Sequence, residues 1–184
     1  MELEILNATE TSTGGISRNV ESSEALNATG TYYAECYDSE GNLKWADTIE
    51  NLVVTVGEND LLDKYFQGSA YTAAWYMGLV SGASTPTYAA TDTLASHAGW
   101  TELAAGTAYT GNRITVGWSA ASAGSKSSTS TSFPIIATNT VAGCLMSSVS
   151  TGTSGILYSA GNFTGGNKSV SSGDTLNVTY TASV

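Results

Sequence analysis

Charge is scarce in this 184-residue chain, because Asp, Glu, Lys and Arg together make up 12% of it, about half the fraction usual in globular domains. Basic residues are the rarest of these, with 6 Lys and Arg against 16 Asp and Glu, and the formal net charge is −10. A surface that binds nucleic acid needs a basic patch to neutralise phosphates. We therefore expect no nucleic-acid partner.

Long apolar runs and secretion signals are also missing. No stretch approaches the roughly 20 apolar residues of a membrane-spanning helix, so we expect no membrane partner. The start, MELEILNATE, lacks the basic region and apolar run of a signal peptide, which predicts a protein that stays in the cytoplasm where it is made. In that compartment Cys36 and Cys144 are predicted to be buried thiols, with a disulfide between them as the alternative.

Recognisable catalytic and metal-binding motifs are absent from the sequence. His97 is the single histidine, and Ser96, Asp92 and Glu102 lie near it without a nucleophile motif such as GxSxG. Neither a metal-ligand spacing nor a glycine-rich phosphate loop occurs. We predict no enzyme activity, no catalytic or metal-binding residues and no cofactor. A carboxylate pair that includes Glu102, as in glycoside hydrolysis, is left open.

Short alternating segments separated by turn residues are what the chain does contain. In residues 31–47, the alternation stops at residues 38–42, which favour a turn, and then resumes. This pattern predicts a β-hairpin. Its first strand would place Tyr32, Ala34 and Cys36 on one face and Tyr33, Glu35 and Tyr37 on the other.

A helix is predicted within residues 51–66, where apolar residues recur every three to four positions. Gly57 interrupts this pattern, and Gly68 is placed to end the helix as a cap. Residues 71–80, which come next, carry no charge and are rich in aromatic residues. This composition predicts a buried strand at the centre of the core. The residues that we expect in the core are Trp75, Leu79, Trp118, Ile135 and Leu176.

The rest of the chain predicts a mainly β fold, an antiparallel β-sandwich or jelly roll formed by residues 31–184. Residues 91–99 are expected to form a helical turn, and residues 119–131 an exposed loop. Residues 1–30 are predicted to be an extended, acidic N-terminal arm, either flexible or ordered only against a neighbouring subunit. The expected later strands are residues 100–103, 113–119, 131–137, 141–149, 155–159 and 174–182, with turns at Gly152, Gly161, Gly165–Gly166 and Ser172–Gly173.

Several segments, in this order, resemble one family of proteins. They include EGNLKWADTIENLVVTVGEN, LLDKYFQGSAYTAAWYMGLVSG, DTLASHAGWTEL, TGNRITVGWSAASAGSKS and GILYSAGNFTGGNKSVSSGDTLNVTYTASV. They are similar to tailed-phage virion structural proteins, and the chain looks like a capsid cement, or head decoration, protein of that group. The resemblance covers residues 31–184. It implies a β-sandwich or jelly roll, a homotrimer, and a place on the outer capsid surface bound to the phage major capsid protein, after synthesis in the host cytoplasm.

Two sets of contact residues follow as expectations. The apolar residues of the arm, Ile5, Leu6, Ile16 and Val20, are predicted to contact the capsid. The hairpin aromatics Tyr32, Tyr33 and Tyr37 are predicted to contact other subunits.

Two other functions remain as alternatives. A tail or fibre subunit would share the β-rich composition, but the sequence lacks the heptads or long repeat of a trimeric shaft. A carbohydrate-binding, adhesin-like module would use tryptophans on its surface. The candidates for such a sugar platform are Trp45, Trp75, Trp100 and Trp118, although core packing is the favoured role for each.

Overall fold

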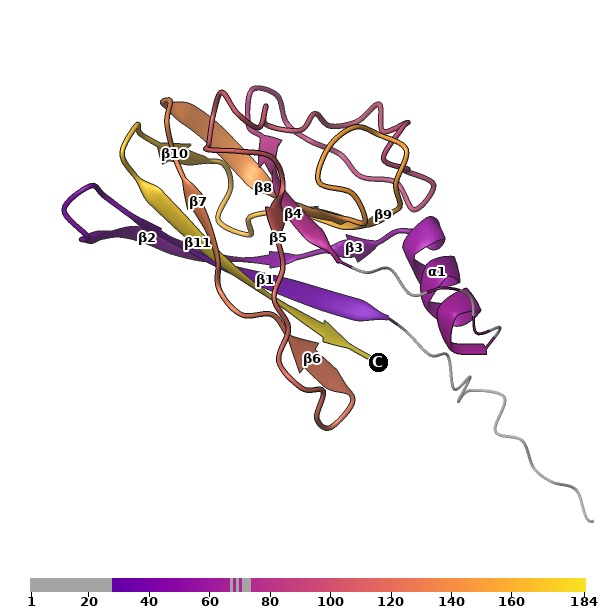
Figure 1. The fold of residues 1–184 in the computed structure, drawn as a ribbon. Coiled ribbons are helices and arrows are strands. Elements are labelled where there is room, and N and C mark those ends of the chain that lie inside the picture. Colours follow the sequence, from indigo (N-terminus) through magenta and orange to yellow (C-terminus); the bar gives the residue numbers. More distant parts are fainter. Residues whose placement is uncertain (1–27, 67, 69, 71–73) are drawn as a thin grey trace, which may run out of the picture.

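The computed structural model describes residues 28–66, 68, 70 and 74–184 (Figure 1). Two antiparallel sheets pack against each other, which confirms the predicted mainly β sandwich. One helix, α1 (Thr55–Phe66), is found in this part of the chain, and it lies at one end of the sandwich. The predicted capsid contacts Ile5, Leu6, Ile16 and Val20 lie outside the described residues.

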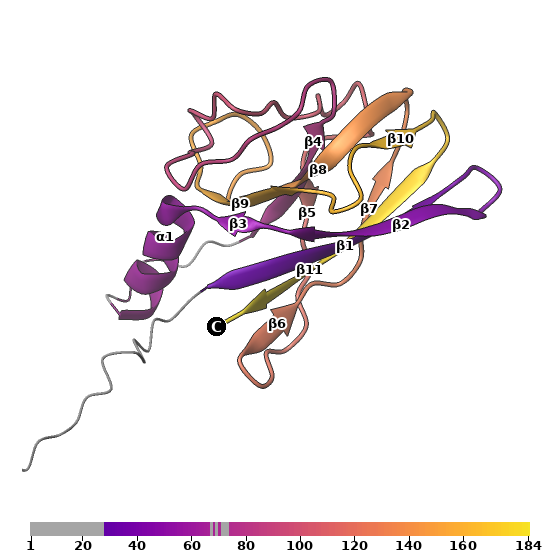
Figure 2. The same cartoon turned by 180° about the vertical axis from the view of Figure 1, so that it is seen from behind.

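The first sheet has the strand order β2-β1-β11-β6, and β7 also pairs with β11. Strands β1 and β11 run the full width of the sandwich and pair over nine residues, as both views of the ribbon show (Figures 1 and 2). The strands of this sheet are β1 (Thr29–Tyr37), β2 (Leu43–Glu50), β6 (Ser125–Ser127), β7 (Thr131–Pro134) and β11 (Thr175–Ser183).

The predicted hairpin forms between β1 and β2. Asp38 shapes its turn, because one carboxylate oxygen accepts hydrogen bonds from the backbone N–H groups of Glu40 and Asn42, each 2.9 Å long. Gly41 supplies the positive φ of 85° that the turn needs. The strand begins at Thr29, two residues before the boundary that we expected. Alternation along β1 is confirmed, since Tyr32, Ala34 and Cys36 are all fully buried.

The second sheet has the order β3-β9-β8-β4-β5, with β10 paired to β8. Its central strands are buried on both faces, unlike β1, where only one face is buried. The outer face is covered by residues 82–103, whose Leu94 and Trp100 pack on Val80 and Leu145. The strands of this sheet are β3 (Leu52–Val53), β4 (Tyr76–Ser81), β5 (Ile114–Thr115), β8 (Asn139–Ser147), β9 (Leu157–Asn162) and β10 (Lys168–Val170).

Several local predictions were wrong. The helix starts at Thr55, because Leu52 and Val53 pair with β9 instead of entering the helix. Gly161 was predicted in a turn but lies inside β9. The neighbouring strand β8 is so close there that a Cβ at Gly143 would meet the Gly161 carbonyl. Residues 91–99 form turns without a helical turn, and residues 100–103 contribute a single bridge. Strands β6 and β10 were not predicted.

The main core lies between the sheets and is rich in aromatic rings. Three of the five predicted core residues are buried there, namely Leu79, Ile135 and Leu176. Trp75 and Trp118 are only half-buried at one end of the sandwich, so their assignment to the interior was wrong. The largest side chains that are fully buried between the sheets are Tyr32, Tyr109, Phe133 and Tyr180.

Cys36 and Cys144 are free and buried, which confirms the predicted thiols. Burial, and after it the nearby Asp174 carboxylate, raise the pKa of the Cys36 thiol to about 12. Burial also raises the pKa of Cys144. Both thiols therefore stay protonated and poorly nucleophilic at neutral pH.

Within the described residues, no helix is long and apolar enough to cross a membrane.

Candidate functional site

Helix α1 meets the sandwich through its first turn. Gly57 lies against β9, and a Cβ at this position would come within 2.6 Å of the Tyr158 carbonyl oxygen. The helix is favoured locally by Glu58 near its N-terminus and by Lys64 in its last turn, which forms an i,i+4 ion pair with Asp60. The first turn of α1 can approach β9 this closely because residue 57 has no side chain.

The last two turns of α1 expose large apolar side chains. Leu61 and Leu62 are 40% and 45% exposed, and Tyr65 and Phe66 are 80% and 73% exposed. The rings of Tyr65 and Phe66 lie edge to face, with centroids 5.1 Å apart. These four residues are called the apolar helix face below. The sequence predicted an apolar side for this helix, and these four side chains stay exposed among the residues that the structure describes. Clustered exposed apolar residues mark contact surfaces.

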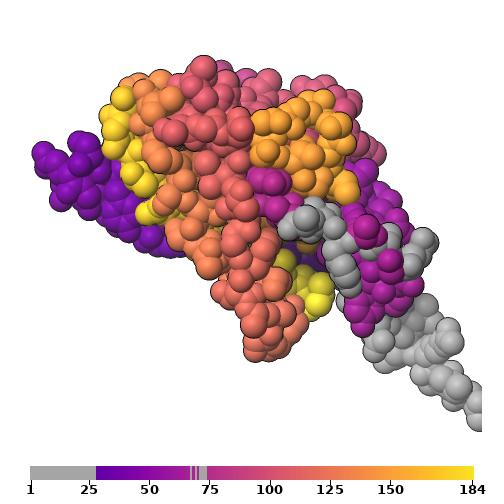
Figure 3. Space-filling view, viewed as in Figure 1, coloured from indigo at the N-terminus to yellow at the C-terminus, as the bar shows by residue number. Residues whose placement is uncertain are grey.

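A cavity of about 240 Å³ opens beside α1, between the ends of the two sheets. The ribbon places α1, β6 and the last residues of β11 at this same end (Figures 1 and 2), and the surface is hollowed between β6 and α1 (Figure 3). This cavity is called the end pocket below. It is lined by Leu61, Trp75, Trp118, Lys126, Met146, Tyr158 and Ala182.

The walls of the end pocket are mainly aromatic and aliphatic. The Trp75 and Tyr158 rings pack edge to face with centroids 5.4 Å apart, and the Trp118 ring centroid lies 6.2 Å from that of the buried Tyr180. Lys126 supplies the charge, and its Nζ donates a 2.8 Å hydrogen bond to the Ser119 carbonyl. Such a pocket suits an apolar group that carries a negative charge at its edge.

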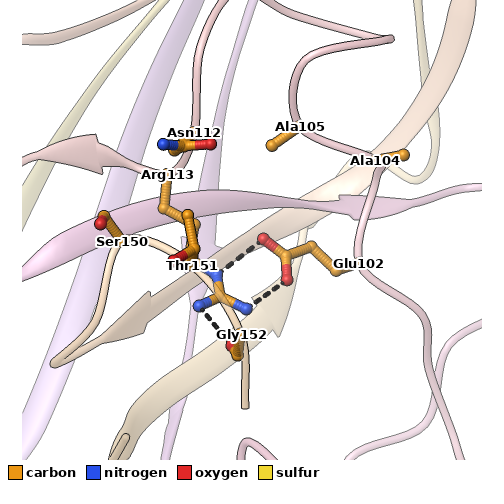
Figure 4. Close-up of a pocket in the computed structure, with 8 residues that line it drawn as sticks. All are labelled: Glu102, Ala104, Ala105, Asn112, Arg113, Ser150, Thr151 and Gly152. Carbon is orange, nitrogen blue, oxygen red and sulfur yellow. Dashed lines mark hydrogen bonds and ion pairs between the residues drawn. The ribbon is translucent and has the colours of Figure 1, made fainter. Parts of the chain in front are cut away.

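A second cavity of about 200 Å³ lies beside Arg113 (Figure 4). The guanidinium faces the Glu102 carboxylate in a two-pronged ion pair, with Nε to Oε1 at 2.8 Å and Nη2 to Oε2 at 2.6 Å. Its Nη1 donates to the carbonyls of Val149 and Gly152, at 3.1 and 3.0 Å. The cavity is lined by Glu102, Ala104, Ala105, Asn112, Arg113, Ser150, Thr151 and Gly152.

Arg113 acts as a tether between three loops. Four of the five N–H donors of a guanidinium are taken by protein acceptors here, and the side chain is 6% exposed. Few groups are left to bind a ligand, so this cavity supports a structural role. Sequence reasoning missed the tether because the acceptors lie 11, 36 and 39 residues away in the chain.

Asp47 holds the loop between β9 and β10. Burial alone would raise its pKa, but hydrogen bonds from Lys168, Thr164 and the N–H groups of Thr48 and Gly165 outweigh that effect and lower the pKa to about 2. The Lys168 ammonium lies 2.7 Å from the carboxylate and 5.9 Å from the Trp45 ring centre. This cluster is therefore a half-buried structural ion pair that joins β2 to β10.

His97 is engaged with its own loop. Its ring stacks on Trp100 with centroids 3.8 Å apart, and Nδ1 lies 3.1 Å from the Trp100 carbonyl oxygen. Asp92 accepts a 3.0 Å hydrogen bond from the Trp100 indole N–H, while Glu102 pairs with Arg113. Across the described part of the chain, no group of three or more His, Cys, Asp and Glu residues is placed to hold a metal ion.

The three hairpin tyrosines predicted to contact other subunits differ in position. Tyr32 is fully buried, and its hydroxyl lies 2.7 Å from Ser159 Oγ. It is therefore a core residue, and the prediction that it contacts other subunits is wrong. Tyr33 is 44% exposed on the outer face of the first sheet, and its hydroxyl donates to Glu35 at 3.1 Å. Tyr37 is half-buried. Contact through Tyr33 and Tyr37 stays a prediction.

The tryptophans also separate into two groups. Trp100 is buried under the outer face of the second sheet, while Trp45, Trp75 and Trp118 are half-buried. Two of them, Trp75 and Trp118, meet in the end pocket although 43 positions separate them. Their neighbours in sequence gave no signal of this meeting.

Comparison with known proteins adds no family to these observations. No protein-family model matches the chain, and no curated protein matches it. Its function is therefore argued from the geometry above and from the resemblance in its sequence.

Proposed function

We propose that this chain is a non-enzymatic virion structural protein of a tailed phage, a capsid cement protein that binds the outer surface of the head. It would be made in the host cytoplasm, assemble as a homotrimer and contact the phage major capsid protein. The observation that carries this proposal is the apolar helix face, where Leu61, Leu62, Tyr65 and Phe66 are exposed together. The segments that resemble phage structural proteins supply the class of partner.

The energetics of the apolar helix face suit a contact repeated many times over. Full burial of one large apolar side chain contributes about 1.5–3 kcal/mol, and Tyr65 and Phe66 leave most of their surface to gain. A single copy would bind weakly because association costs entropy. An oligomer that presents several such faces to a lattice gains affinity through multivalency, which is how a small subunit stabilises a head.

Contacts between subunits are assigned to Tyr33 and Tyr37, on the face of β1 turned away from the core. The two side chains flank Glu35 on the same face, since residues two apart along a strand point the same way. Ile5, Leu6, Ile16 and Val20 stay as candidate capsid contacts.

The test combines mass and binding. Light scattering of the purified protein is expected to give a trimer mass, and a sedimentation assay with undecorated heads is expected to show saturable binding. The double variant Tyr65→Ser and Phe66→Ser should keep its fold and lose most of its binding. Ile136→Ser removes an apolar side chain that is 46% exposed after β7 and is the matched control. Undiminished head binding by the double variant would refute the role of the apolar helix face.

A second candidate function, carbohydrate binding, is favoured by the meeting of Trp75 and Trp118 in the end pocket. Aromatic rings stack on sugars, but a sugar also needs hydrogen-bonding side chains around its hydroxyls. Lys126 is the charged residue of this lining, beside six mostly apolar or aromatic ones. A glycan array with wild type and Trp118→Ala would test this function, and specific binding lost in the variant would replace the cement proposal.

A further inference from the structure

The described chain begins beside the end pocket. In the pairing of β1 with β11, Gly30 lies opposite Ala182, and Ala182 lines the pocket. Ala28 packs at the edge of the same core. Residues 1–27 therefore join the fold beside this apolar cavity.

Lys126 gives this mouth a charge preference. In the part of the chain that the structure describes, Lys44, Lys64, Arg113 and Lys168 each form a salt bridge with a carboxylate. Lys126 is the basic residue there without one, and it bonds only to a carbonyl. A binding partner that brings a carboxylate next to apolar side chains would match both the pocket and this lysine.

The first six residues of the chain have this chemistry. In MELEIL, Met1, Leu3 and Ile5 alternate with Glu2 and Glu4. In an extended segment, residues two apart share a side, so one side is apolar and the other acidic.

We propose that the end pocket binds residues 1–6 of its own chain. Leu3 and Ile5 enter the cavity between Trp75 and Trp118, and a glutamate pairs with Lys126. The 21 residues between Leu6 and Ala28 span up to about 70 Å when extended, so reach does not limit the contact. A segment joined to its binding site by a short linker is present there at an effective concentration on the order of millimolar, which favours the chain's own segment over a second copy.

This contact has a consequence for the candidate capsid residues. Ile5 is held by the protein itself, while Leu6, which the alternation places on the side of Glu2 and Glu4, stays with Ile16 and Val20 as a candidate capsid contact. The contact forms in the isolated protein whether or not the chain binds a capsid.

The first experiment tests occupancy in the full-length protein. Leu3→Glu with Ile5→Glu should shift the tryptophan emission to longer wavelength and raise the fluorescence of the apolar dye ANS several-fold, because the pocket empties. Ile16→Glu with Val20→Glu adds the same charge to the same arm and should leave both signals at wild-type values. Adding Trp75→Phe or Trp118→Phe should remove the emission shift, since Trp45 and Trp100 lie elsewhere. Equal signals from the two double variants would overturn the proposal.

The second experiment identifies the occupant. Ile5→Cys with Lys126→Cys should form a disulfide within one chain in dilute protein, seen as a monomer band of altered mobility on a non-reducing gel. Ile16→Cys with Lys126→Cys is the control and should crosslink at least several-fold more slowly. The native thiols are buried and should not interfere. A dimer-sized band would make a second copy the occupant, and a glycan that binds equally well to wild type and to Leu3→Glu, Ile5→Glu would show an empty pocket; either result overturns the proposal.

Discussion

The middle of the sandwich and its α1 end use the same kinds of side chain in opposite ways. In the middle, Phe133 and Tyr109 pack edge to face with centroids 5.1 Å apart, and both are fully buried. At the α1 end, Tyr65 and Phe66 form the same kind of pair at the same separation, yet both are mostly exposed. Aromatic pairing alone therefore does not separate residues that hold the fold from residues that are available to a partner. What separates them is whether other residues of the chain bury the pair.

The largest expected effect compares two phenylalanines. Phe133→Ala should lower the free energy of unfolding by about 3–5 kcal/mol, because it leaves a cavity in a closed core. Phe66→Ala should change it by less than about 0.5 kcal/mol, since the ring is exposed in the monomer. Urea unfolding of both variants gives the comparison. A large loss for Phe66→Ala would mean that the α1 end is covered within the monomer, and the two regions would no longer differ.

The Arg113 cluster adds a polar counterpart to this comparison, because it is held by an ion pair and hydrogen bonds and not by aromatic packing. Glu102→Gln should destabilise the fold by about 3 kcal/mol, because it leaves a largely buried guanidinium without its carboxylate. Adding Arg113→Met should recover part of that loss, since no unpaired charge then remains. Thermal or urea unfolding of the three proteins measures this. If Glu102→Gln unfolds like wild type, solvent screens the pair and the tether is weak.

Close packing at the start of β1 provides a third test. A Cβ at Gly30 would lie 1.9 Å from the hydroxyl oxygen of the buried Tyr180, so Gly30→Ala should destabilise the fold by about 1–3 kcal/mol through overpacking. Thr31→Ala, on the exposed face next to it, is the control and should change stability by less than about 0.5 kcal/mol. Equal stability of the two variants would show that the α1 end has room to relax, unlike the middle.

The smallest effect is a pH dependence. Asp47 has a folded-state pKa of about 2, against an ordinary value of 3.8, so its contribution to stability is present above about pH 4 and is lost as the pH falls towards 2. Asp47→Asn should remove this part of the acid sensitivity while leaving the stability curve near neutral pH parallel to that of wild type. Urea midpoints at several pH values would show it. An unchanged acid slope in Asp47→Asn would assign the sensitivity to other carboxylates.

Local patterns in the sequence predicted what depends on neighbours in the chain. The hairpin was predictable because the alternation around Tyr32 and the turn at residues 38–42 lie within one short segment. Periodicity also identified which residues of α1 share a side. Periodicity says nothing of what covers that side, because the covering residues come from distant parts of the chain.

The end pocket and the Arg113 tether were beyond such reasoning for the same physical reason. The pocket joins residues from position 61 to position 182, and the tether joins Glu102 and Arg113 to carbonyls near residue 150. Trp75 and Trp118 were expected inside because they sit in or beside strand-like segments. Their place at the end of the sheets depends on strand lengths, and β4 and β5 turned out shorter than predicted.

Because Thr29 pairs with Ser183, the start of β1 and the end of β11 lie together at the α1 end. This arrangement decides where foreign peptides can be attached. Cargo fused after Val184 would emerge at the same end as α1 and would crowd the surfaces through which the protein is proposed to bind. The turn between β1 and β2 lies at the far end of β1 (Figure 1), and a Cβ added at Gly41 in this turn would meet no other atom within 4 Å. Exposed loop tips of this kind accept insertions, which makes this turn the position of choice for inserting an epitope or an enzyme without covering the α1 end.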